Sequence, residues 1–129
     1  MIAVDASAVL AILLLEAEAA EFKALLERTG GRISPVNLWE VTARAHALGG
    51  ADGVAEARRL LSDLSIEVTE IGEPAARLAL AAFARFGKGT GRGPLNLGDC
   101  FAYALAQVEG DGLLFKGDDF TKTDVKPAI

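Results

Sequence analysis

The stretch "IAVDASAVLAILLL", from Ile2 to Leu15, decides the fold class, because in it a short apolar strand passes directly into an apolar helix. Residues 2–5 predict a buried strand, and residues 6–15 predict a helix. A strand followed at once by a helix is the repeating unit of folds with a parallel sheet. The stretch therefore predicts an α/β protein whose first strand ends at Asp5.

The same alternation continues along the chain. Further helices are expected over residues 18–28, 34–48, 51–61, 73–86 and 97–109. Further strands are expected over residues 32–34, 66–71 and 113–115, with a short edge strand near Val125. Glycine pairs end two of these helices, and Ser34-Pro35 starts one as an N-cap followed by proline. The pattern predicts a three-layer α/β/α sandwich with a small, mainly parallel central sheet, in one domain of residues 1–129.

The composition excludes a disordered chain, since 51% of the residues are hydrophobic and the mean hydropathy is +0.31. The longest apolar run, Ala8–Leu15, is far shorter than the roughly 20 residues that span a bilayer. No Lys or Arg precedes it, as would be expected in a signal peptide. The single cysteine, Cys100, excludes an intrachain disulfide and a cysteine-rich metal site. We therefore expect a cytoplasmic protein without a membrane segment.

The net charge of −5 and the pI near 4.8 argue against a protein that coats nucleic acid electrostatically. They do not argue against an enzyme that cuts nucleic acid with metal ions. A carboxylate cluster that holds divalent cations presents positive charge locally, whatever the total charge of the chain.

Five acidic residues lie where carboxylates are unusual. Asp5 closes the first predicted strand, and Asp118 and Asp119 follow the strand at 113–115. In open parallel sheets, functional sites lie outside the carboxyl ends of the strands, so both positions belong to the functional edge. Glu40 lies on the apolar stripe of its helix. Asp99 lies in the first turn of the helix at 97–109, at the start of its apolar face.

Each of these acids also has an ordinary structural explanation. Asp5 suits a helix N-cap, and Asp99 is favoured in the first turn of its helix by the helix dipole. Glu40 is spaced to form a salt bridge with Arg44, four residues on. The two aspartates after the last strand suit a turn.

Taken together, the acids favour a metal site. Carboxylates packed at one sheet edge would repel and raise one another's pKa unless a cation neutralised them. Oxygen ligands of this kind suit Mg²⁺ or Mn²⁺, and the chemistry that follows is metal-assisted hydrolysis of a phosphodiester.

Basic residues gather around "GKGTGRGP", residues 87–94. Arg85, Lys88 and Arg92 occur there with no acid between them, in an otherwise acidic protein. The functional hypothesis is contact with an RNA backbone beside the metal site. The alternative is a flexible, solvated loop.

Other function classes fit less well. An aspartyl phosphotransferase of the haloacid dehalogenase type needs a second acid two residues after Asp5, where this chain has Ser7. A phosphatase or a non-catalytic interaction domain remains the alternative. One histidine, His46, is too little for a Ser-His-Asp site, and Trp39 is expected in the core. The apolar helices near residues 8–26 and 36–61 exceed what a small sheet needs, which predicts an exposed apolar groove or a dimer face.

Four segments carry a resemblance to a known family: "VDAS" (4–7), "WE" (39–40), "LNLGDCFAYALA" (95–106) and "LLFKGDDFTKTD" (113–124). In this order they resemble the PIN-domain ribonucleases, and among them the VapC-type toxins of prokaryotic toxin–antitoxin pairs. The resemblance extends from residue 2 to about residue 125.

The resemblance implies a Mg²⁺- or Mn²⁺-dependent endoribonuclease that a co-expressed antitoxin inhibits and that forms homodimers. It implies that Asp5 and Asp99 are direct metal ligands and that Glu40 is the helical acid of a quartet. Many relatives carry two acids separated by one residue after the last strand, whereas this chain has glycine and then Asp118 and Asp119. Both aspartates therefore stay candidates for the fourth acid.

Overall fold

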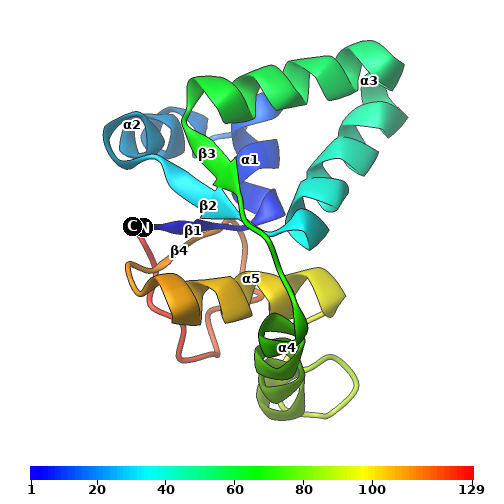
Figure 1. Ribbon diagram of the computed structural model, residues 1–129, viewed down its shortest axis with the longest axis vertical. Helices are drawn as coiled ribbons and strands as arrows, with labels where there is room; N and C mark the ends of the chain where they lie inside the picture. Colours follow the sequence, from blue (N-terminus) through cyan, green and yellow to red (C-terminus); the bar gives the residue numbers. More distant parts are fainter.

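The computed structural model describes residues 1–129 as a central sheet with helices on both faces (Figure 1). The elements, in chain order, are β1 (Ala3–Val4), α1 (Ala6–Leu13), α2 (Ala19–Thr29), β2 (Gly31–Ile33), α3 (Pro35–Asp63), β3 (Ile66–Val68), α4 (Glu73–Phe86), α5 (Leu97–Glu109) and β4 (Leu113–Leu114). The predicted three-layer α/β/α architecture is confirmed. None of the helices is both long and apolar enough to cross a membrane.

The four strands form a parallel sheet in the order β3-β2-β1-β4. β1 lies inside the sheet, with Ala3 paired to Arg32 of β2 and Val4 paired to Leu114 of β4. The backbone N–H of Asp5 donates to the carbonyl of Leu114 at 2.9 Å, so the ladder extends to the first acid of the chain. The carboxyl ends of β1 and β4 therefore lie side by side.

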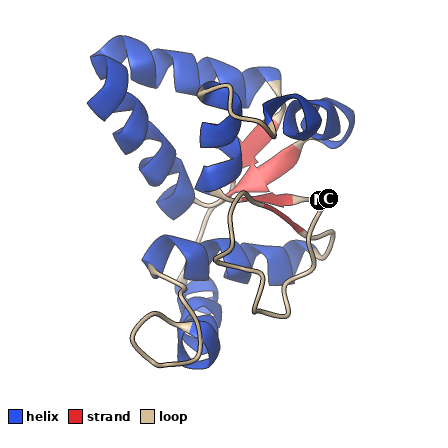
Figure 2. Ribbon diagram, turned by 180° about the vertical axis from the view of Figure 1, so that it is seen from behind, coloured by secondary structure: helices blue, strands red, loops and turns tan.

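Each face of the sheet buries its own core. Helices α1, α2 and α3 cover one face, while α5 covers the other and α4 packs against α5 on the side away from the strands (Figures 1 and 2). Successive strand residues point to opposite faces, so Val4 and Leu114 join the first core while Ala3 and Leu113 join the second. Strands that are buried on both faces read as unbroken apolar runs, as in Ile2–Val4.

Helix α3 bends sharply at Gly50, whose backbone has φ 61° and ψ −148°. The two helices predicted on either side of the glycine pair are therefore two arms of one bent element, seen at the upper right of Figure 1. A side chain at Gly53 would collide with the carbonyl of Ala45, so the two arms pack closely against each other next to the bend. Ala45 on the first arm and Ala57 and Leu61 on the second are buried in the first core, which lies between the sheet and helices α1, α2 and α3.

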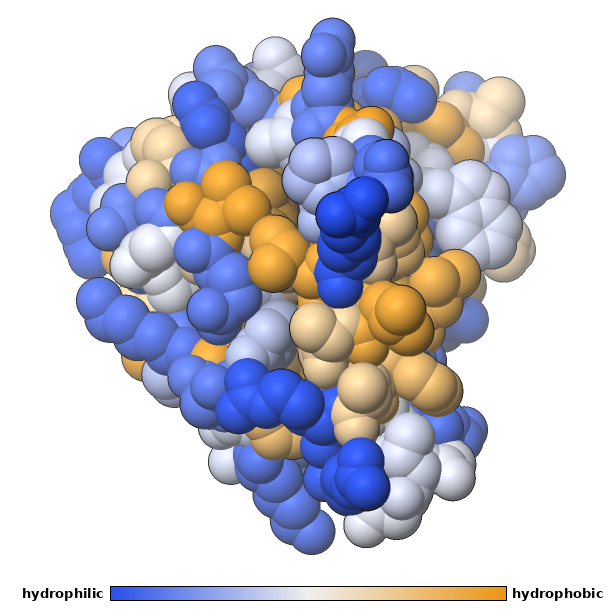
Figure 3. Space-filling view, turned by 60° about the horizontal axis from the view of Figure 1, so that its bottom comes forward, coloured by the Kyte–Doolittle hydropathy of each residue, from blue (hydrophilic) through white to orange (hydrophobic).

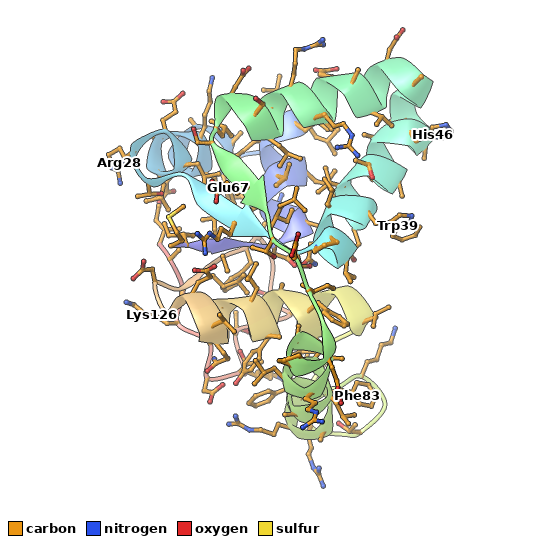
Figure 4. The ribbon with its side chains drawn as sticks, in the orientation of Figure 1. Arg28, Trp39, His46, Glu67, Phe83 and Lys126 are labelled. Carbon is orange, nitrogen blue, oxygen red and sulfur yellow. The ribbon has the colours of Figure 1, made fainter.

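Two local expectations were wrong. Near Val125 the chain forms only one isolated bridge, between Leu113 and Pro127, and no strand. Proline has no N–H to donate, so it blunts the sheet edge there. Trp39 is 68% exposed instead of buried, and Figure 4 shows it and His46 on the outer side of α3.

Replacing Leu114 with alanine should destabilise the protein strongly, because this side chain is fully buried in the first core, between the sheet and helices α1, α2 and α3. The expected loss in the free energy of unfolding is about 2–5 kcal/mol. Leu48→Ala is the matched control, since Leu48 is 55% exposed, and it should change stability by less than about 0.5 kcal/mol. Urea denaturation measures both, and equal losses would contradict this description of the core.

Candidate functional site

Four acidic side chains line one hollow at the carboxyl ends of β1 and β4. The hollow has a volume of about 300 Å³, and its acids are Asp5, Glu40, Asp99 and Asp119. They come from the end of β1, the second turn of α3, the first turn of α5, and the turn after β4. This carboxylate hollow lies at the sheet edge where the sequence predicted a site.

The structure distinguishes the two aspartates that follow β4. Asp119 lines the carboxylate hollow, whereas Asp118 lines a neighbouring cleft only. Phe120 is buried and its ring packs on Phe115, with the ring centroids 5.0 Å apart. This packing fixes the register of the turn. The carbonyl of Asp118 accepts bonds from Thr121, as expected of a turn residue.

Asp5 is buried and also caps a helix. Its Oδ2 accepts the backbone N–H of Ser7 at 3.0 Å and the Ser7 hydroxyl at 2.5 Å. The Ser7 hydroxyl in turn accepts the backbone N–H of Lys116 at 3.0 Å, which ties the start of α1 to the turn after β4. Burial raises the pKa of Asp5 to about 6, although the bonds from Ser7 oppose the shift. The N-cap predicted as an alternative is therefore present inside the hollow.

Asp99 lies in the first turn of α5, where it forms a capping box with Asn96. The backbone N–H of Asn96 donates to Oδ2 of Asp99 at 3.1 Å, and the side chain of Asn96 accepts the N–H of Asp99 at 2.9 Å. Burial, together with the charges of Asp5 and Asp119, raises the pKa of Asp99 to about 7. Its carboxyl group is thus destabilised in the charged form by its surroundings.

No basic side chain neutralises these acids. None of the four carboxylates has a Lys or Arg nitrogen within 4.0 Å. The salt bridge considered between Glu40 and Arg44 is absent, although Arg44 lines the same hollow. Lys116 also lines it, but its ammonium pairs with Glu16 and Glu18. None of the four acids of the hollow is therefore held in a salt bridge.

Asn37 was missed by the sequence reasoning, yet it holds Glu40 in place. It is fully buried and donates to Oε1 of Glu40 at 2.8 Å and to the carbonyl of Gly98 at 3.0 Å. Its own amide oxygen accepts the hydroxyl of Ser34 at 2.7 Å. These bonds join the start of α3 to the start of α5. An asparagine on the apolar face one turn before an acid is the signal that could have revealed it.

Gly98 provides the space for Glu40. A β-carbon built on Gly98 would collide with both carboxylate oxygens of Glu40. The glycine that precedes Asp99 in the sequence therefore permits the acid of α3 to approach the helix that carries Asp99.

The donor set fits a hard divalent cation. A carboxylate has about four lone-pair positions, so the bonds to Asp5 and Asp99 leave each with capacity to bind a metal ion. No three acidic, histidine or cysteine side chains lie close enough together to hold one metal ion between them. Mg²⁺ usually keeps several waters and binds proteins through one or two carboxylates, which agrees with an open arrangement of this kind.

The three basic residues predicted to contact RNA do not converge. Arg85 forms an ion pair with Asp124 at 3.0 Å and donates to the hydroxyl of Tyr103, so it braces α4 against α5 and the C-terminal segment. Lys88 and Arg92 lie in the loop between α4 and α5. None of the three lines the carboxylate hollow.

Comparisons with known proteins agree with this geometry. A family model described as PIN domain matches residues 2–126. Ribonuclease VapC42 of Mycobacterium tuberculosis is 42% identical over 127 residues, which cover 97% of each chain. Ribonuclease VapC30 of the same species is 37% identical over 95% of this chain and 94% of its own. Ribonuclease VapC of Mycolicibacterium smegmatis is 37% identical over 95% of each chain.

One solved structure shows the same fold. The crystal structure of Mycobacterium tuberculosis VapC20, described as a sarcin-ricin loop cleaving toxin, superposes with a TM-score of 0.77. The match covers 100% of this chain and 98% of VapC20, at 16% sequence identity. At this identity the likeness concerns the fold alone.

The raised pKa values of Asp5 and Asp99 predict that the metal-free protein loses stability as pH rises. Both groups have an ordinary value of 3.8, so between about pH 4 and 7 the folded state keeps protons that the unfolded state releases. The free energy of unfolding therefore falls across this window. Asp99→Asn removes one of the two buried charges and should be more stable than wild type at pH 8 but not at pH 4.

Urea denaturation in EDTA at both pH values measures this effect. Asp118→Asn removes the same charge outside the hollow and is the matched control. An Asp99→Asn advantage of equal size at pH 4 and pH 8 would contradict the prediction.

Proposed function

The chain belongs to the PIN domain family, among the VapC ribonucleases, and we propose that it is a single-domain endoribonuclease that hydrolyses RNA phosphodiester bonds with Mg²⁺ or Mn²⁺. The observation that carries this proposal is the carboxylate hollow, where four acids gather without a basic partner. The names of the relatives at 37–42% identity support the reaction class.

Asp5 and Asp99 would hold the metal ion. Both are fixed by backbone N–H donors at a helix start, so their carboxylates need no reorganisation to receive a cation. The ion, when bound, helps generate hydroxide from water and stabilises charge on the phosphate and the leaving oxygen. It also removes the repulsion that raises the pKa of Asp99.

Glu40 and Asp119 complete the site from the opposite walls. Asn37 orients the carboxylate of Glu40, and the space above Gly98 lets it face the hollow, so it can hold the attacking water and accept its proton. Water attacks phosphorus directly, and no covalent intermediate with the protein is needed. The second residue after Asp5 is Ser7, whose hydroxyl is already engaged, so nothing favours an aspartyl phosphotransferase.

An apolar groove is suited to the antitoxin. It has a volume of about 560 Å³ and lies between α1, α2 and the second arm of α3. Leu15 on its rim is 86% exposed, and Lys23, Glu56 and Arg59 add charges of both signs. An amphipathic segment of an antitoxin would bury this apolar surface, which matches the groove expected on these helices.

A second copy of the chain would bury a different surface. Leu80 and Phe83 of α4 and Leu97 at the start of α5 are exposed, and Figure 3, with the α4 side brought forward, shows apolar surface there. We propose that homodimers form through this side, which leaves the antitoxin groove on the opposite helical layer accessible.

The proposed activity is tested by incubating purified protein, free of antitoxin, with RNA and Mg²⁺ or Mn²⁺. Cleavage should require the metal and stop with EDTA, and Asp99→Asn should reduce it by about 100-fold or more, since it removes a metal ligand. Asp119→Asn should also impair cleavage, whereas Asp118→Asn should not reduce it. Cleavage that persists both in EDTA and in the Asp99→Asn variant would refute the proposal.

The position of Glu40 is tested by Gly98→Ala. The added methyl group pushes the flexible end of Glu40 aside, so stability should stay within about 1 kcal/mol, because alanine also favours a helix. Cleavage should fall by about 100-fold, since misplacement of a catalytic group by about 1 Å has effects of that size. Gly49→Ala, where the new methyl meets nothing within 4 Å, is the control. Full activity of folded Gly98→Ala would show that Glu40 does not act from this position.

A further inference from the structure

A second cleft adjoins the carboxylate hollow, and we propose that it binds the sugar–phosphate backbone of the RNA strand on one side of the bond that is cut. The cleft has a volume of about 680 Å³ and is lined by residues 91–94 and by residues of the turn at 118–122. Asp119 lines both the cleft and the hollow, so the two adjoin at this residue. This inference rests on the proposed function, because it takes RNA as the substrate.

The wall formed by the α4–α5 loop is preformed. The N–H of Lys88 donates to the carbonyl of Leu95 at 2.8 Å, and the N–H of Leu95 donates to the carbonyl of Phe86 at 3.0 Å. Leu95 is fully buried. A side chain at Gly93 would collide with the carbonyl of Phe86, so this glycine lets the loop close on the end of α4. The glycine-rich segment is therefore a bonded wall and not a loose loop.

Two cations of the cleft are free to bind an external anion. Neither Arg92 nor Lys122 has a carboxylate oxygen within 4.0 Å. Arg92 donates one N–H to the carbonyl of Ala84 at 2.9 Å, which anchors the guanidinium at the C-terminus of α4 and leaves its other donors available. Although the chain is acidic overall, with a net charge of −5, segments far apart in the sequence bring these two cations into the lining of one cleft.

The chemistry of the lining favours phosphate and sugar over bases. Its residues are glycine, proline, Asp, Arg, Thr and Lys, and no aromatic side chain is among them. Single-strand sites that hold bases stack them on aromatic rings, whereas backbone contacts come from Arg, Lys, Thr and backbone N–H groups. Asp118 and Asp119 also line the cleft and repel anions, so binding has to come from Arg92 and Lys122 specifically.

This assignment changes the basic set that the sequence suggested. Arg85 is committed to Asp124, and Lys122, which is 30 positions after Arg92 in the sequence, takes its place. Figure 2 shows the two segments that carry them, the loop between α4 and α5 and the segment after β4, as loops on the same side of the sheet as α5. A strand lying in the cleft passes Asp119 into the carboxylate hollow, which delivers a phosphodiester to the acids.

The test measures binding of a labelled single-stranded RNA oligonucleotide to the Asp99→Asn protein, which does not cleave it. Arg92→Ala, Lys122→Ala and the double variant are compared over a range of salt concentrations. Each lost phosphate contact should lower the slope of log affinity against log salt by about 0.7. The double variant should bind at least about tenfold more weakly, which corresponds to about 1.4 kcal/mol.

Arg28→Ala and Lys126→Ala are the matched controls. They remove the same charges from exposed positions outside the cleft, at the left of Figure 4, and should leave both affinity and slope unchanged. Arg92→Lys keeps the charge and should keep most of the salt slope, which separates loss of a contact from loss of the fold. A double variant that binds RNA like the two controls would overturn the inference.

The outcomes separate the cleft from the proposed function. If wild type cleaves RNA but the double variant binds like the controls, the cleft is refuted and the nuclease stands. If the variants lose binding but wild type cleaves no RNA in Mg²⁺ or Mn²⁺, the cleft is supported and the proposed function fails.

Discussion

Charge repulsion among buried carboxylates is the constraint on which the rest of this structure depends. Asp5 and Asp99 lie in a hollow with Glu40 and Asp119, and none of the four is in a salt bridge with a basic side chain. Burial and mutual repulsion raise the pKa of both aspartates, so the charged form is costly in the folded protein. A bound divalent cation would remove this cost, which explains why a stable fold retains the cluster.

The scaffold holds the acids with bonds that also build the fold. Asp5 caps α1 and Asp99 forms the capping box of α5, so the structural and functional explanations of these residues are compatible. Asn37 joins the starts of α3 and α5, and Gly98 gives Glu40 room between them. Asp5 and Asp99 are thus placed by the start of a helix, where backbone donors are available, whereas Glu40 is held by a side-chain amide and Asp119 lies in the turn after β4.

Much of the fold could be predicted because its signals are local. Helices α4 and α5 were predicted with the bounds that they have, Glu73–Phe86 and Leu97–Glu109, since glycines and capping residues mark their ends. The break in α3 was likewise visible in its glycine pair. The prediction of an edge strand near Val125 was wrong because the C-terminal segment pairs with β4 at one position only, where Leu113 bonds to Lys126 and Ala128, and pairing with a distant strand is not encoded locally. The prediction that Trp39 is buried was wrong because the exposed face of a helix depends on which other elements pack against it.

The sequence by itself determined the order of strands and helices, the parallel sheet and the acids that reach its carboxyl edge, because periodicity and chain direction are local properties. The tertiary structure alone decided that Asp119 and not Asp118 lines the hollow, since the packing of Phe120 on Phe115 sets the turn. It also decided that Arg44 leaves Glu40 unpaired and that Lys122 lies across from Arg92. Side-chain direction in such places follows contacts between residues far apart in the chain, which no local pattern encodes.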